Sequence, residues 1–491
     1  MDIEASKTRN VFTIITLAIL LAGIFDYLFF GKVIGLSVLV FTGLLVAVLY
    51  WLSVRFKYSY KSSLWLIVPI GFFALMPSIR ANLFLNFLNI IAVIGLLLLI
   101  TKELLQEHIT KFGLKEYFLT VFQLPLKFLA NSIKPLRYAI NSFSQSSTGK
   151  WRRVVIGFLM ALPVLIIFTV LFSSADLAFG QFTRSIFSLN LPDVFFKHIY
   201  LILAIFIGLL GTFEYVFKAS TVLPVMAPAE NKEVNTTDRE VETGVFLSLI
   251  ALLFLIFIIF QVTYLFGGEV NIINRGFTYA EYARHGFWEL LVVASATLVI
   301  LFFTDKYTRR ETSRKAWFTV PTTIIILEIL VIITSAFKRL MLYQDTYGMT
   351  MLRFYVAGFI IFLAVIFILL AIKFIIEKKE DFFTFASLLT MIVFLAGVNF
   401  INPDAFIAHK NIVRFNQTGR IDASYLANLS PDAIPQIIAV YDSLSDENKN
   451  IVRDMVLSNQ IRWERSLANW QSYNFSTSKA TAKLQLFILE K

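Results

Sequence analysis

The chain contains no cysteine, which excludes disulfides, thiolate metal sites and cysteine nucleophiles. Histidine is also scarce, and no two of the four residues have the i, i+3 or i, i+4 spacing of helical metal ligands. The motifs of P-loop proteins, serine hydrolases and zinc proteases are absent. The sequence therefore predicts no metal and no cofactor, and a non-enzymatic role is favoured over an enzyme.

Charge is sparse and apolar residues dominate: 16% of the chain is charged, 57% is hydrophobic, and 51 residues are Phe. A helix that crosses a hydrocarbon core of roughly 30 Å needs about 17–25 such residues in a row. The apolar runs lack the alternation of barrel strands. Transmembrane helices are expected at residues 11–30, 33–52, 63–79, 83–101, 154–172, 199–217, 244–266, 288–304, 318–337, 354–376 and 384–401.

This pattern predicts an all-α, polytopic helical membrane protein with about 11 transmembrane helices and a small helical domain after the last one. We divide it into a four-helix part (1–101), a basic amphipathic segment (102–153), two spans (154–217), a linker (218–243), five spans (244–401) and the C-terminal domain (402–491). Helix starts inside the last domain are signalled by Asn402-Pro403, Asp422, Ser430-Pro431 and Ser445.

The basic residues are distributed unevenly between the two sides of the predicted spans. With the N-terminus inside, 25 of the 44 Lys and Arg residues fall on the inner side, counting Lys373 at the inner end of its span, and nine fall on the short outer loops. This positive-inside asymmetry predicts a multi-pass protein with a cytoplasmic N-terminus and an extracytoplasmic C-terminus. It also explains the net charge of +11 without a nucleic-acid partner.

Segment 102–153 carries nine basic residues among aromatic and aliphatic ones, and Pro125 and Pro135 interrupt it. Its apolar runs are too short to span, so short helices are expected there. Membrane lipid is one expected partner, with the lysines facing anionic headgroups. A cytoplasmic elbow that packs under the bundle is the alternative.

Several helix ends are unusually dense in polar and aromatic residues, namely 173–176, 261–268, 278–289, 335–355 and 402–409, followed by 421–433 and 470–474. In these stretches, from about Ser173 to the C-terminus, the sequence resembles bacterial membrane proteins of domain-of-unknown-function family 4173, close to family 4153. Leu177-Ala178 departs from the proline-containing continuation expected there. The resemblance implies an integral inner-membrane protein and supplies no activity.

By this topology the dense helix ends meet on one face. We expect an outward-facing polar site formed by Asp176, Gln261, Tyr264, Glu281, Arg284, Arg339, Tyr343, Arg353 and Asp404. Its carboxylates and guanidiniums could bind an anionic ligand, or could pair with one another and only fasten the helix ends together. Glu328, near the middle of its span, is the candidate intramembrane acid, because a carboxylate there is costly unless it is paired, wet or protonated.

Three functions fit these features. The leading prediction is a membrane protein that binds or moves a small solute or lipid through the outward polar site. The alternative is a sensor or scaffold whose extracytoplasmic domain meets a protein partner. The third is a lipid- or envelope-modifying enzyme. A transporter needs a polar path to Glu328, whereas a scaffold needs an exposed groove and an enzyme needs a catalytic group in an open pocket.

Overall fold

The computed structural model describes residues 2–145, 193–220, 240–265, 287–307, 316–376 and 380–490. Within these ranges every regular element is a helix, and ten helices are long and apolar enough to cross a membrane. The protein is therefore an all-α polytopic membrane protein. Ten of the eleven predicted spans coincide with these helices, and the remaining one, residues 154–172, lies outside the described residues.

The first bundle consists of α1 (Asp2–Phe29), α2 (Leu36–Arg55), α3 (Ile67–Ile79), α4 (Leu83–Leu104) and α10 (Asp193–Phe217). A short 3-10 helix, Lys61–Leu66, leads into α3. These helices share one apolar core that includes Ile14, Phe73 and Phe213. The spans form because nearly all their residues are apolar, and each helix satisfies its own backbone polar groups as hydrocarbon requires.

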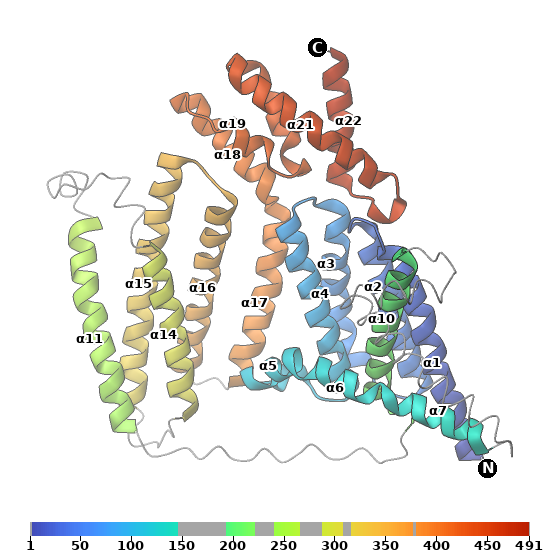
Figure 1. Cartoon of the computed structure of the whole chain (residues 1–491). Coiled ribbons are helices and arrows are strands. Elements are labelled where there is room, and N and C mark those ends of the chain that lie inside the picture. Colours follow the sequence, from blue (N-terminus) through green and yellow to red (C-terminus); the bar gives the residue numbers. More distant parts are fainter. Residues whose placement is uncertain are drawn as a thin grey trace, which may run out of the picture.

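The second bundle consists of α11 (Glu240–Leu265), α14 (Phe287–Tyr307), α15 (Ala316–Tyr347) and α16 (Met351–Ile375). Its core lies mainly between α15 and α16 and contains Ile329 and Phe367. An ion pair joins two of its helices, with Lys373 Nζ 2.5 Å from Asp305 Oδ2. Helix α17 (Glu380–Ile401) stands between the two bundles and contributes side chains to both apolar cores (Figure 1).

The N- and C-termini lie at opposite ends of the molecule (Figure 1). We call the end at which α1 begins the N-terminal face, and the end that carries the last helices the C-terminal face. Three short helices, α5 (Leu114–Phe122), α6 (Leu124–Asn131) and α7 (Ile133–Gln145), lie across the N-terminal face, roughly at right angles to the spans (Figure 1). We call them the peripheral helices.

The C-terminal face carries a domain of α18 (Pro403–Thr418), α19 (Ala423–Ala427), α20 (Ile434–Val440), α21 (Asp446–Leu467) and α22 (Phe475–Glu490). Its apolar core continues into the membrane part, since Leu85, Phe354 and Val398 belong to the same cluster as Ile407 and Ile434. The domain is therefore packed directly onto the helix ends.

The predicted helix starts of this domain are confirmed, since helices begin at Pro403, Ala423, Pro431 and Asp446, but two of the four preceding side chains do not cap them. Asp422 and Ser445 cap their helices by accepting hydrogen bonds from the backbone N–H groups of Tyr425 and Asn448. The capping role predicted for the Asn402 side chain is wrong. Asn402 adopts a left-handed conformation with φ 58° and makes no cap hydrogen bond, because the chain turns sharply there from α17 into α18. Ser430 does not cap either, since its hydroxyl donates to Asp432 instead.

Candidate functional site

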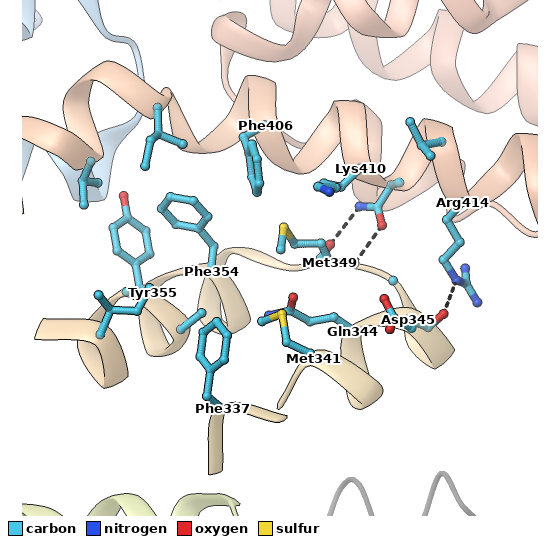
Figure 2. Close-up of a pocket in the computed structure, with 18 of the residues that line it drawn as sticks. Phe337, Met341, Gln344, Asp345, Met349, Phe354, Tyr355, Phe406, Lys410 and Arg414 are labelled. Atoms are coloured by element: carbon cyan, nitrogen blue, oxygen red, sulfur yellow. Dashed lines mark hydrogen bonds between the residues drawn. The ribbon is translucent and has the colours of Figure 1, made fainter. Parts of the chain in front are cut away.

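A cavity of about 820 Å³ lies at the C-terminal face, where α15, α16 and α17 meet α18. Most of its wall is apolar, and Figure 2 shows the side chains that line it. The aromatic rings of Phe354 and Phe406 pack 5.8 Å apart where α16 meets α18. The apolar wall is completed by Phe337, Met341, Met349, Ile361, Phe394, Val398 and Ile401.

The cavity extends far down the membrane helices. On α16 it reaches Ile361, ten residues past the first residue of that helix, and on α15 it reaches Phe337, ten residues before its last. At a helical rise of 1.5 Å per residue, this is a depth of roughly 15 Å, about half of the hydrocarbon thickness of a bilayer. Ile361 and Ile401 are half exposed, at 51% and 52%, so the cavity also borders the lipid-facing surface.

Small residues leave this space open. Gly397 on α17 lines the cavity, and no atom outside its own helix lies within 4 Å of the position its Cβ would occupy. Gly358 on α16 faces the Phe394 ring, whose nearest atom is 3.1 Å from the corresponding position. A Cβ at Gly397 would therefore lie in open space at the wall of the cavity.

Most of the polar lining residues lie at the end of the cavity formed by α18 and the α15–α16 turn. Two basic residues, Lys410 and Arg414, line this end of the cavity. The Lys410 side chain is exposed and makes no hydrogen bond to the turn between α15 and α16. Arg414 holds that turn, donating from Nε to the Asp345 carbonyl at 3.0 Å and from Nη2 to the Thr346 carbonyl at 2.5 Å. Asn411 holds the same turn through two 2.8 Å hydrogen bonds to the Met349 backbone.

A second set of polar groups, which we call the buried junction, fastens the C-terminal domain to the turn between α3 and α4. Its centre is Asp432, whose carboxylate is fully buried. It accepts hydrogen bonds from the Ala81 backbone N–H at 2.7 Å and from the Ser476 hydroxyl at 2.6 Å. The Arg80 guanidinium lies 3.9 Å away. Asn474 adds two hydrogen bonds from its amide group to the carbonyls of Pro77 and Arg80.

Asp404 belongs to the same junction and is 1% exposed. Its Oδ2 atom accepts hydrogen bonds from Asn82 Nδ2 at 3.0 Å and from the Ser430 backbone N–H at 3.1 Å. Its Oδ1 atom is buried and has no hydrogen-bond partner. Burial raises the pKa of the Asp404 carboxyl, an effect that the hydrogen bonds from Ser430 and Asn82 oppose. The junction thus contains one fully paired carboxylate and one half-paired carboxyl.

The predicted outward site is brought together in part. Arg339 is buried on α15, and Arg353 on α16 stacks its guanidinium 4.0 Å from the centre of the Tyr343 ring while donating to the Gly348 carbonyl. Tyr343 and Arg353 therefore meet where α15 ends and α16 begins. Asp404 lies instead in the junction, where its hydrogen bonds go to Asn82 and Ser430.

The other predicted residues are placed less fully. Gln261 and Tyr264 lie in the last turns of α11, and their side chains are not described. Asp176, Glu281 and Arg284 fall outside the described residues. The single connected site therefore stays a prediction.

Glu328 is 7% exposed in the middle of α15, and its Oε2 atom has no hydrogen-bond partner. The cavity wall on α15 begins at Phe337, nine residues further along, or roughly 13 Å by helical rise. The cavity therefore stops short of Glu328. No group of three or more potential metal ligands occurs among the residues that the structure describes.

Sequence reasoning missed the cavity and half of the junction. Lys410 directly follows the dense stretch 402–409 but was not singled out. Gly397 has no motif around it, and a glycine in an apolar helix resembles any other part of a span. Asn82 was missed although it lies two residues after Arg80 in a short turn between two spans. Arg80 and Asn82 are two polar residues in a turn on the face that carries the C-terminal domain. This pattern is the signal that could have revealed the junction.

Comparison with known proteins gives a family and no activity. The family model described as "Domain of unknown function (DUF4153)" matches residues 67–440, more than two thirds of the chain. No curated protein and no solved structure matches. The match begins at α3, so it covers two of the first four spans, which the motif resemblance had left out. It ends in α20, before the stretch 470–474. The chain belongs to the DUF4153 family.

Proposed function

We propose that this integral membrane protein binds a lipid or lipid-like amphiphile in the cavity at its C-terminal face. The observation that supports this is the cavity's shape: an apolar space about one leaflet deep, bordering the lipid-facing surface and carrying a basic group at its outer end. Pockets for small ligands combine a mostly apolar wall with a few polar groups that orient the ligand. Here an acyl chain would lie between α16 and α17 while Lys410 binds an anionic headgroup.

Binding accounts for the site better than transport does. A transporter would need a polar path that continues toward Glu328, and the cavity ends roughly 13 Å short of that residue along α15. The buried junction is compatible with binding, because the hydrogen bonds of Asp404 tie the first turn of α18 to Asn82 and Ser430. Sequence analysis left open that the charged groups only fasten the helix ends together. We assign that role to the buried junction, where charged and amide side chains attach the C-terminal domain to the membrane helices.

The cavity can be filled without disturbing the backbone. In Gly397→Phe the new ring would exclude at least two methylenes of a bound chain, which at ~0.8 kcal/mol each weakens binding about tenfold. The matched control is Gly43→Phe, on the exposed side of α2, where the Cβ position is equally open. Saturable binding of fluorescent phosphatidylglycerol to the purified protein in detergent measures the effect. Equal affinities for the two variants would contradict the proposal.

The headgroup part of the proposal has its own variant. Lys410→Gln should reduce the preference for fluorescent phosphatidylglycerol over fluorescent phosphatidylcholine, while leaving the affinity for phosphatidylcholine unchanged. Gly397→Phe should weaken both lipids. If Lys410→Gln binds both lipids as the native protein does, the anionic headgroup is the wrong ligand class for this end of the cavity.

For orientation, we place the N-terminal face in the cytoplasm and the C-terminal face outside a bacterial inner membrane. The support is the excess of Lys and Arg on the segments of the N-terminal face. Because the chain has no cysteine, a single introduced one is its only thiol. A membrane-impermeant maleimide added to intact spheroplasts should label Lys410→Cys and spare Lys115→Cys. The reverse pattern would overturn the orientation, and with it the outward position of the cavity.

A further inference from the structure

The peripheral helices carry a row of exposed apolar side chains that the bundle leaves uncovered. On α5, Phe118 and Phe122 are each 59% exposed and stack 4.4 Å apart, and on α6 Leu126 is 65% exposed. Leu114, Val121, Leu129 and Ile133 are 40–52% exposed as well. In water this would be an unusually large apolar surface for three short helices.

These helices lie at the depth of the membrane boundary and not beyond it. The Phe128 backbone of α6 packs directly against Gly211 of α10, six residues before the last residue of that helix. By helical rise this contact is about 9 Å inside the end of α10. On α7, the Tyr138 hydroxyl is 3.2 Å from the Thr8 hydroxyl, near the first residue of the α1 span. The exposed apolar side chains are therefore beside hydrocarbon or headgroups.

The same helices and the turn before them carry a strong excess of positive charge. From residue 111 to residue 145 the sequence has five basic residues and one acidic residue, Glu116. All five basic side chains are exposed, and no ion pair between described residues involves them. They are Lys111, Lys115, Lys127, Lys134 and Arg137.

We propose that the peripheral helices form a second lipid-binding surface, which inserts its aromatic and aliphatic side chains into the leaflet at the N-terminal face and selects anionic phospholipid headgroups through its five basic residues. Apolar side chains beside a row of cations are what an interfacial helix presents to an anionic leaflet. A protein partner that covered this surface would have to occupy space belonging to the bilayer. The surface is at the opposite face from the cavity and does not depend on it.

Insertion can be measured with a single fluorophore. Bimane attached to Phe122→Cys, in full-length protein reconstituted into an equal mixture of phosphatidylcholine and phosphatidylglycerol, should emit to the blue and be quenched by nitroxide-labelled lipid. Bimane on Asp454→Cys, at an exposed position of α21, is the aqueous control. An unquenched, water-like signal from Phe122→Cys would overturn the proposal and leave a protein-docking surface as the alternative.

Headgroup selection is tested by charge removal. Spin-labelled phosphatidylglycerol should be held at the protein surface in preference to spin-labelled phosphatidylcholine, and more weakly at high salt. Changing the five basic residues to Gln should lower that preference at least about fivefold. This lower bound is the effect of roughly one basic side chain near an anionic surface. The control removes five exposed charges from the other face: Arg453, Arg462, Arg465, Lys479 and Lys483.

Equal preferences in the two variants would overturn the role of the five residues. If the first variant fails to fold, Lys115→Gln combined with Lys127→Gln should still shift the preference in the same direction by a smaller factor. No shift in that pair would count against the proposal.

Discussion

Asp432→Ala is expected to loosen the C-terminal domain from the membrane helices and to lower the free energy of unfolding by roughly 3–5 kcal/mol, the cost of removing one partner of a buried charge pair. The alanine would leave the Ala81 N–H and the Ser476 hydroxyl without their acceptor and Arg80 without its counter-ion. Thermal unfolding in detergent, followed by the intrinsic tryptophan fluorescence to which Trp463 and Trp470 of this domain contribute, measures the loss. Asp454→Ala, on the exposed face of α21, should change stability by no more than about 0.5 kcal/mol.

Asp404 provides a contrast within the same junction. Asp404→Asn keeps an oxygen that can accept from Asn82 and Ser430 and removes the cost of burying a charge, so stability at neutral pH should be unchanged or higher. Burial raises the pKa of Asp404 above its ordinary value of 3.8. Its contribution to stability is therefore complete below that value and is lost as the pH rises through the raised pKa.

The native junction should accordingly be more stable in mild acid than at neutral pH, and Asp404→Asn should remove that part of the pH dependence. If Asp404→Asn destabilises the protein as much as Asp432→Ala does, the carboxyl is ionised and paired, and this account of the junction is wrong.

The fold was largely predictable because hydropathy alone decides where a chain can cross a bilayer. Residues 83–101 and 384–401 were expected to span, and α4 and α17 contain them, each a few residues longer. Helix α4 continues to Leu104, where the buried Glu103 side chain accepts a hydrogen bond from the Ile109 backbone N–H and shapes the next turn. The amino-acid composition alone does not distinguish such a buried carboxylate, which lies inside the helix, from one that marks the end of a transmembrane span.

The candidate site was much less predictable, since it depends on contacts between distant parts of the chain. Asp404 was expected in the outward polar site, whereas its hydrogen-bond partner in the structure, Asn82, is 322 positions away in the sequence. The cavity depends on the absence of side chains at Gly397 and on the angle at which α18 leaves α17. Neither property has a periodic signal. Sequence patterns indicate which residues lie at one end of the transmembrane helices. Only the tertiary packing shows which of those residues contact one another.

Gly211→Leu is expected to be the most disruptive single change among the peripheral contacts. A Cβ at this position would lie 1.9 Å from the Phe128 carbonyl oxygen and 2.6 Å from its carbon, and neither backbone atom can move without shifting α6. Displacing α6 would expose the buried Leu124 and Phe128 side chains and separate the Phe128 ring from Tyr215, now 5.5 Å away. Overpacking plus lost burial costs roughly 3–6 kcal/mol.

Gly208→Leu is the matched control, because it lies one turn earlier on α10 and has no neighbour within 4 Å of its Cβ position. The displacement itself can be followed with Leu124→Cys, whose side chain is 1% exposed in the native protein. Maleimide should react with this cysteine rapidly in the Gly211→Leu background and slowly in the Gly208→Leu background. Equal stability and equal labelling in the two backgrounds would show that α6 is not held against α10. In that case the depth assigned to the peripheral helices would lose its main support, because that depth is measured from the contact between Phe128 and Gly211.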